Sequence, residues 1–137
     1  MKYRGVAEDI RKLADLVAED IDFDILVGSF IDFNKNFVKK GRIEEARTSF
    51  LPNPKALAGL VPDGDIFDGF LAAMAEQLHA DWSLGERPSW VNEEWRCLPE
   101  PHYTIQTTNQ AFIEKLHQIS PPAFNKRNLF YTERVLD

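Results

Sequence analysis

Apolar side chains recur at three- and four-residue steps along most of this chain, which is the spacing of one face of an α-helix. The clearest stripe follows the acidic run at 19–22. Its members are Leu26, Phe30, Phe33 and Phe37. Lys39 and Lys40 suit the negative end of a helix, and Gly41 suits the position just beyond it. The pattern therefore predicts a helix that begins after the acidic run and ends before Gly41.

The same periodicity predicts helices on both sides of this one. We expect them at about 6–18, 42–50, 65–79 and 108–119. A further short helix is expected at 54–60, because Asn53 is a good cap and Pro54 suits a first helical position. The side chains expected to face inward in the two later long helices are Phe67, Phe70, Leu71, Met74, Leu78, Phe112, Leu116 and Ile119.

Between Trp82 and Tyr103 the helical pattern gives way to prolines and tryptophans. We predict a long irregular connection there, containing a short helix near 89–96. The apolar residues 129–131 follow two prolines and favour a short extended segment. The predicted fold class is all-α in the main, a compact single-domain bundle of about five to six helices with a long Trp/Pro-rich connection and a short extended C-terminal segment.

Size and charge restrict the choice of partners. A chain of 137 residues with 44% hydrophobic residues is suited to one domain with a continuous core. The formal charge of -6 makes nucleic acid an unfavourable partner, because phosphate binding needs a clustered basic surface. An acidic surface is better matched to a basic protein.

Cysteine usage and hydropathy indicate the compartment. Cys97 is the only cysteine, so the chain cannot form an internal disulfide and a reducing environment is expected. No apolar stretch follows Lys2 and Arg4, and no run approaches the length of a membrane span. We therefore expect a cytoplasmic protein with neither a secretory signal nor a membrane segment.

The residues that most often bind metals are poorly placed for it. His79, His102 and His117 each lack a second ligand at helical spacing. The run that starts at Asp20 begins like a calcium loop, but isoleucines stand where that loop needs glycine and a bidentate glutamate. We predict no metal and no cofactor.

Catalytic patterns are equally weak. Cys97 has no recognisable neighbouring base, and we expect a buried structural thiol. The pairs Glu44-Glu45 and Glu93-Glu94 are adjacent in sequence, so a helix turns their carboxylates apart. No catalytic residue is assigned, and a binding protein is favoured over an enzyme. A small helical ligand-binding protein or enzyme, with the Trp-rich connection as a pocket wall, remains the alternative.

Three groups of residues are candidates for binding a partner protein. The first is the acidic set at the start of the second helix, and the others are two tryptophans and one arginine. Their members are Asp20, Asp22, Asp24, Trp90, Trp95 and Arg127. The tryptophans either lock the irregular connection to the core or anchor an interface, and the first role is favoured. Arg127 either binds carbonyls of its own fold, which its apolar neighbours favour, or offers a planar fork to an acidic partner.

Several segments in their combined order resemble a known family. They are 28–33 (GSFIDF), 68–78 (DGFLAAMAEQL), 88–90 (PSW) and 120–130 (SPPAFNKRNLF). The order resembles that of small bacterial antitoxin-like proteins, which are encoded beside nucleotidyltransferases that act as the toxin. The resemblance spans about 24–136 and implies a role as a binding partner without implying catalytic residues.

The leading hypothesis is therefore a module that binds and neutralises the enzyme encoded by the adjacent gene. Acidic side chains, including those at Asp15, Glu19 and Asp32, would be attracted to a phosphate-binding cleft. A DNA-binding autoregulator is a weaker alternative, supported only by the bases at 35–47. The apolar content predicts a folded monomer or homodimer.

Overall fold

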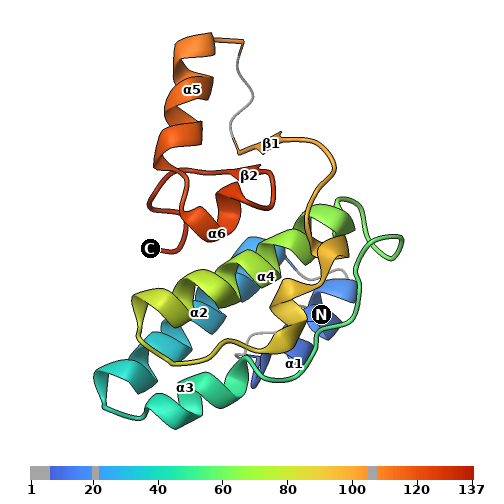
Figure 1. Cartoon of the computed structure of the whole chain (residues 1–137). Helices are drawn as coiled ribbons and strands as arrows, with labels where there is room; N and C mark the ends of the chain where they lie inside the picture. Colours follow the sequence, from blue (N-terminus) through green and yellow to red (C-terminus); the bar gives the residue numbers. More distant parts are fainter. Residues whose placement is uncertain (1–6, 20–21, 105–107) are drawn as a thin grey trace.

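The computed structural model describes residues 7–19, 22–104 and 108–137, and these parts of the chain are mostly helical (Figure 1). The α-helices are α1 (Ile10–Ala18), α2 (Phe23–Lys39), α3 (Ile43–Ser49), α4 (Gly64–Asp81), α5 (Gln110–Ile119) and α6 (Pro122–Asn125). Two 3₁₀ turns, η1 (Ser89–Asn92) and η2 (Glu94–Arg96), and two short strands, β1 (His102–Tyr103) and β2 (Leu129–Phe130), complete the described elements. The predicted all-α fold is confirmed.

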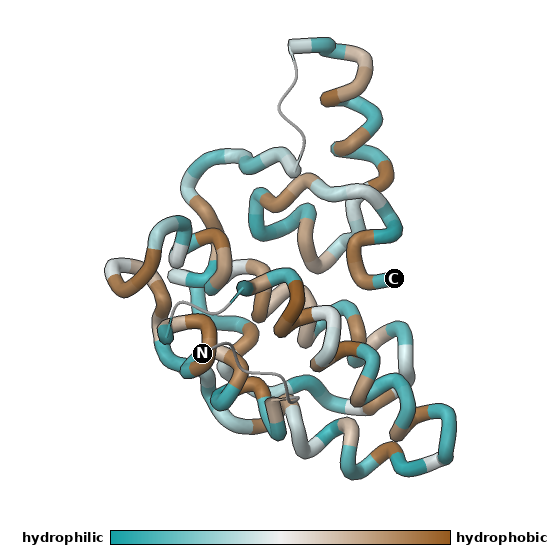
Figure 2. Tube along the Cα trace, turned by 180° about the vertical axis from the view of Figure 1, so that it is seen from behind, coloured by the Kyte–Doolittle hydropathy of each residue, from teal (hydrophilic) through white to brown (hydrophobic). Residues whose placement is uncertain are grey.

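Helix α4 lies at the centre of the arrangement (Figure 1). Helices α1, α2 and α3 lie on one side of it, while α6 and the strand pair lie on the other, and α5 projects away from the rest. Brown and teal segments alternate along the helices in Figure 2, as expected for elements with one apolar face. Leu71 and Met74 of α4 are completely buried, and Phe70 packs edge-on against Phe124 of α6 at a centroid distance of 5.2 Å.

Side-chain caps define where the first two helices begin. The Asp9 carboxylate accepts the backbone N–H of Lys12 at 2.8 Å, so α1 begins at Ile10 rather than near residue 6 as predicted. The Asp22 carboxylate accepts the N–H of Ile25 at 3.2 Å and starts α2. Gly41 follows the end of α2 with φ of 74°, a conformation that glycine adopts without strain. The predicted bounds of α2 are confirmed.

The helix predicted at 54–60 is wrong, because long-range hydrogen bonds occupy this backbone. The carboxylate of Asp68 on α4 accepts the N–H groups of Leu57 and Ala58 at 2.8 and 3.0 Å. The carbonyl of Pro54 accepts a hydrogen bond from buried Arg96 at 2.9 Å. These hydrogen bonds to Asp68 and Arg96 take the place of the backbone hydrogen bonds that a helix at 54–60 would need.

Two further differences concern the second half of the chain. The short helix expected near 89–96 is two separate 3₁₀ turns, and α6 was not predicted, although proline suits its first position. The extended segment expected at 129–131 is confirmed in part as β2, which pairs in parallel with β1 through His102 with Leu129 and Tyr103 with Phe130. On projecting α5 only Leu116 is fully buried, whereas Phe112 and Ile119 are half-buried.

Candidate functional site

A groove of about 540 Å³ lies where the start of α1, the second half of α2 and α3 meet. Its apolar lining includes Phe33, Phe37 and Pro52. Its charged lining consists of Glu8, Asp9, Glu44 and Glu45, and none of its lining residues in the described ranges is Lys, Arg or His. The volume lies within the usual range for ligand pockets, of about 300–1,000 Å³. The groove therefore combines an apolar floor with an acidic border.

A buried side-chain hydrogen bond beside the groove links α2 to α3. Asn34 is completely buried, and its side-chain amide donates to the Phe30 carbonyl at 2.9 Å. The Ser49 hydroxyl donates to the side-chain oxygen of Asn34 at 2.7 Å. Phe33 packs edge-on against Phe37 with their ring centroids 4.8 Å apart. Phe33 is nevertheless 39% exposed, which is unusual for a phenylalanine on a helix that supplies core residues.

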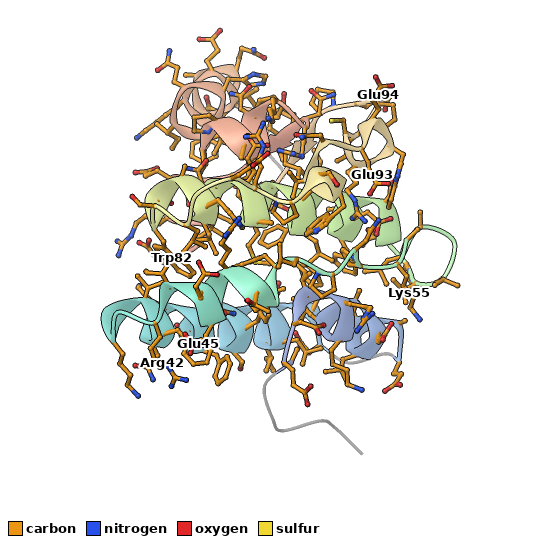
Figure 3. The ribbon with its side chains drawn as sticks, turned by 60° about the horizontal axis from the view of Figure 1, so that its bottom comes forward. Arg42, Glu45, Lys55, Trp82, Glu93 and Glu94 are labelled. Carbon is orange, nitrogen blue, oxygen red and sulfur yellow. The ribbon has the colours of Figure 1, made fainter. Side chains whose placement is uncertain are left out.

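The groove has a guanidinium at one end. Arg42 lies 5.1 Å from the centroid of the Phe37 ring, and its Nε and Nη2 atoms donate to Glu45 Oε1 at 3.1 and 3.0 Å. The backbone N–H of Glu45 and then the Arg42 side chain lower the pKa of the Glu45 carboxyl. Figure 3 shows Arg42, which directly precedes α3, close to Glu45 in the first turn of this helix. At this end of the groove, the Phe37 ring and the Glu45 carboxylate thus bind the guanidinium of Arg42.

The remaining acidic side chains of the border differ in their partners. Glu44 lies 3.7 Å from Arg47 and its side chain is 79% exposed, so this ion pair is weak. Asp9 caps α1. No ion pair involving Glu8 is seen within the described residues. Among the described residues, the acidic side chains on the α1 side of the groove therefore have no basic side chain paired with them.

The acidic residues singled out from the sequence are distributed around the α1–α2 hairpin. Asp22 and Asp24 are exposed at the start of α2, whereas Asp20 lies outside the described residues. Asp15 on α1 lies 3.6 Å from Lys55. Asp24 lies about 14 Å along the helix axis from Phe33, at about 1.5 Å per residue. The acidic start of α2 and the groove are therefore separate acidic parts of the surface.

Trp90 and Trp95 have different roles in the structure. The Trp90 ring is buried, and its Nε1–H donates to the Phe50 carbonyl at 2.9 Å, which ties η1 to the end of α3. Trp95 is 49% exposed and lies 4.1 Å from the guanidinium of Arg96. Trp90 therefore fixes the irregular connection to the core, as favoured from the sequence. Its prediction as a partner-binding residue is wrong, because the ring is buried. Only Trp95 has a substantial free surface.

The prediction of Arg127 as a partner-binding residue is wrong, because its side chain lies inside the fold. It is 2% exposed and donates to the carbonyls of Ala123 and Val91 at 2.7 and 2.6 Å. It also donates to Glu76 Oε1 at 2.8 Å. Glu76 in turn contacts Lys126 at 2.6 Å and Arg87 at 3.2 Å. Arg127 therefore joins α6 to α4 and η1 rather than facing solvent.

The histidines and the cysteine form no catalytic arrangement in the described parts of the chain. His79 is buried, burial lowers its pKa, and its Nδ1 donates to the Ala75 carbonyl at 2.7 Å. His117 is exposed and stacks on Phe130 at a centroid distance of 3.8 Å. Cys97 is exposed, so the predicted buried thiol is wrong, because the chain turns Leu98 rather than Cys97 into the core.

Residues 7–19, 22–104 and 108–137 contain neither a metal-binding cluster nor a helix that could cross a membrane. No cluster of three or more His, Cys, Asp or Glu side chains suits a metal ion there. Within the same ranges, the helices are too short or too polar to span a bilayer. The hollow beside Trp90, of about 350 Å³, is lined by neither Cys97 nor His102. A hollow beside Trp90 that contained Cys97 or His102 would have strengthened the ligand-binding alternative, and this hollow does not do so.

A second large hollow, of about 500 Å³, lies between α4 and the C-terminal segment. Its charged lining is mixed, with Lys35 beside Asp81, Glu133 and Asp137. The lining of the α1–α3 groove has four acidic residues and no basic residue among those described, so it selects more strongly for a positively charged ligand than this mixed lining does. We therefore take the α1–α3 groove as the candidate site.

Sequence reasoning missed this groove. Phe33 and Phe37 follow the helical spacing of core residues, and they were assigned to the buried stripe of α2. The adjacency of Glu44 and Glu45 in the sequence predicts that their carboxylates point apart, and it does not reveal that both residues line a groove with aromatic rings.

Comparison with protein-family models, with curated proteins and with solved structures gave no match.

Proposed function

We propose that this chain is an antitoxin-like interaction module that acts in the cytoplasm by binding and neutralising a partner enzyme. The observation that carries the proposal is the α1–α3 groove, whose lining combines the partly exposed rings of Phe33 and Phe37 with four acidic side chains. An apolar centre surrounded by charge is the usual composition of a protein-binding surface. The partner that best fits it has a basic surface.

The resemblance in segment order supports a specific partner, a nucleotidyltransferase toxin encoded by the adjacent gene. An enzyme of this class binds phosphates, so its active-site cleft is expected to be positively charged. Asp22, Asp24 and Asp32 are exposed on α2 and would attract such a cleft from a distance. The groove would then supply the short-range contacts.

The DNA-binding alternative receives less support. It depended on the basic residues Lys35, Lys39, Lys40, Arg42 and Arg47. Arg42 and Arg47 are each paired with a glutamate of α3, so this cluster is partly neutralised within the chain. Its remaining lysines are too few to offset a net charge of -6.

Co-expression of this chain with the product of its adjacent gene tests the proposal. We expect a complex that co-purifies at low salt and weakens as salt rises, because exposed charges are screened beyond about 8–10 Å at physiological ionic strength. We also expect growth inhibition by the neighbour alone and relief by this chain. Absence of both the complex and the relief would contradict the proposed function.

A further inference from the structure

Each end of the α1–α3 groove has a phenylalanine ring and an acidic side chain in its lining. At the α3 end, the Phe37 ring and the Glu45 carboxylate hold the guanidinium of Arg42. At the α1 end, the partly exposed Phe33 ring lies in the same groove as Glu8. No arginine or lysine within the described residues is seen over the Phe33 ring.

We propose that the α1 end of the groove binds an arginine side chain of the partner protein. This inference rests on the proposed function and names the chemistry of the contact. The guanidinium would lie on Phe33 and donate to Glu8, as Arg42 lies on Phe37 and donates to Glu45. The planar, weakly hydrated guanidinium suits a ring face and a carboxylate together better than an ammonium does.

The charge of the site favours this occupant. Its four acidic lining residues are accompanied by no basic lining residue among those described. Glu45 is paired with Arg42, and Glu44 is paired with Arg47. The other two acidic lining residues, Glu8 and Asp9, lie at the α1 end. Pro52 and the edge of Phe37 provide an apolar surface for a residue next to the bound arginine. The occupant is thus an arginine-containing segment with an adjacent apolar side chain.

A short synthetic peptide tests this contact without the partner. The probe is a 12-residue helical peptide with two arginines and adjacent leucines, compared with peptides in which citrulline or lysine replaces both arginines. We expect the arginine peptide to shift the NMR signals of Phe33, Phe37 and Thr48. Citrulline has the shape of arginine without its charge, so we expect its peptide to bind at least about tenfold more weakly, as for loss of a charge-assisted hydrogen bond. The lysine peptide should lie between them.

Two variants of the chain locate the contact. Phe33→Leu keeps an apolar side chain but removes the ring, and we expect about three- to fivefold weaker binding of the arginine peptide. Glu8→Gln should reduce the preference for arginine over citrulline. Equal binding of all three peptides, no detectable binding, or NMR shifts away from the groove would overturn the inference. A complex with the adjacent gene product that both variants leave unchanged would also overturn it, while the proposed function would stand.

Discussion

Replacing Arg96 with alanine is expected to lower the free energy of unfolding by about 4 kcal/mol, a large part of the 5–15 kcal/mol typical of a domain. The side chain is completely buried and lies 4.8 Å from the ring centroid of Trp90. It donates to the carbonyls of Asp68 and Pro54 and to the side chain of Asn53. Alanine would leave these acceptors unpaired and open a cavity in the irregular connection. Urea unfolding followed by tryptophan fluorescence measures the loss.

Two variants show whether the geometry or the charge of Arg96 matters. Arg96→Lys keeps the charge but cannot form the same planar fork, so we expect it to recover less than half of the lost stability. Arg134→Ala removes an arginine that is 80% exposed in its side chain and pairs with Asp137 at 2.9 Å, and it should change stability by less than about 0.5 kcal/mol. Equal losses for Arg96→Ala and Arg134→Ala would contradict the structural role of Arg96.

Replacing Glu76 with glutamine is expected to cost about 3 kcal/mol at neutral pH. The Glu76 side chain is 12% exposed and contacts Arg127 and Lys126 at 2.8 and 2.6 Å. Glutamine keeps the size of the side chain but removes the negative charge, so buried Arg127 would lose its counterion. Glu114→Gln makes the same chemical change at an exposed position of α5 and should be almost neutral. Thermal and urea unfolding of both variants provide the comparison.

The effect of Glu76 should also depend on pH. Burial raises the pKa of Glu76, but the hydrogen bonds and charges of Lys126 and Arg127 outweigh burial, and the pKa lies below its ordinary value of 4.5. A lowered pKa in the folded state means that the carboxylate stabilises the fold fully above the unfolded value and loses this effect as the pH falls through the folded value. The difference in unfolding free energy between the wild type and Glu76→Gln should therefore shrink below about pH 4.5. A difference that stays constant into acid would contradict this assignment.

Local patterns in the sequence were sufficient for most of the helices. The stripe that includes Leu26 and Phe30 predicted α2 correctly, because a helix with one buried face needs that spacing wherever it packs. The inward side of α4 was also predicted, with Phe70, Leu71 and Met74 buried. These features depend on neighbours within one or two turns and need no knowledge of the tertiary fold.

Features that depend on distant partners were not predictable in this way. Residues 54–60 carry good helix-start signals, yet Asp68 and Arg96 engage their backbone. Arg127 was recognised as a residue with two alternative roles, and burial beside Glu76 decides between them. The groove brings Glu8 and Phe33 together from elements that are far apart in the sequence. Side-chain spacing along one helix contains no information about such contacts.

The affinity of the adjacent gene product for matched charge-reversal variants tests the central claim most directly. The first double variant, Glu8→Lys with Glu44→Lys, reverses the charge of two lining residues of the groove. The second, Asp24→Lys with Asp32→Lys, reverses the charge of two exposed residues on α2. The control, Glu100→Lys with Glu114→Lys, makes the same change elsewhere on the surface. All three double variants change the net charge equally. We predict a complex with the wild type, at least about tenfold weaker binding for the groove variant, slower association for the α2 variant and little change for the control. No complex with the wild type, or equal affinities for the groove and control variants, would contradict the account.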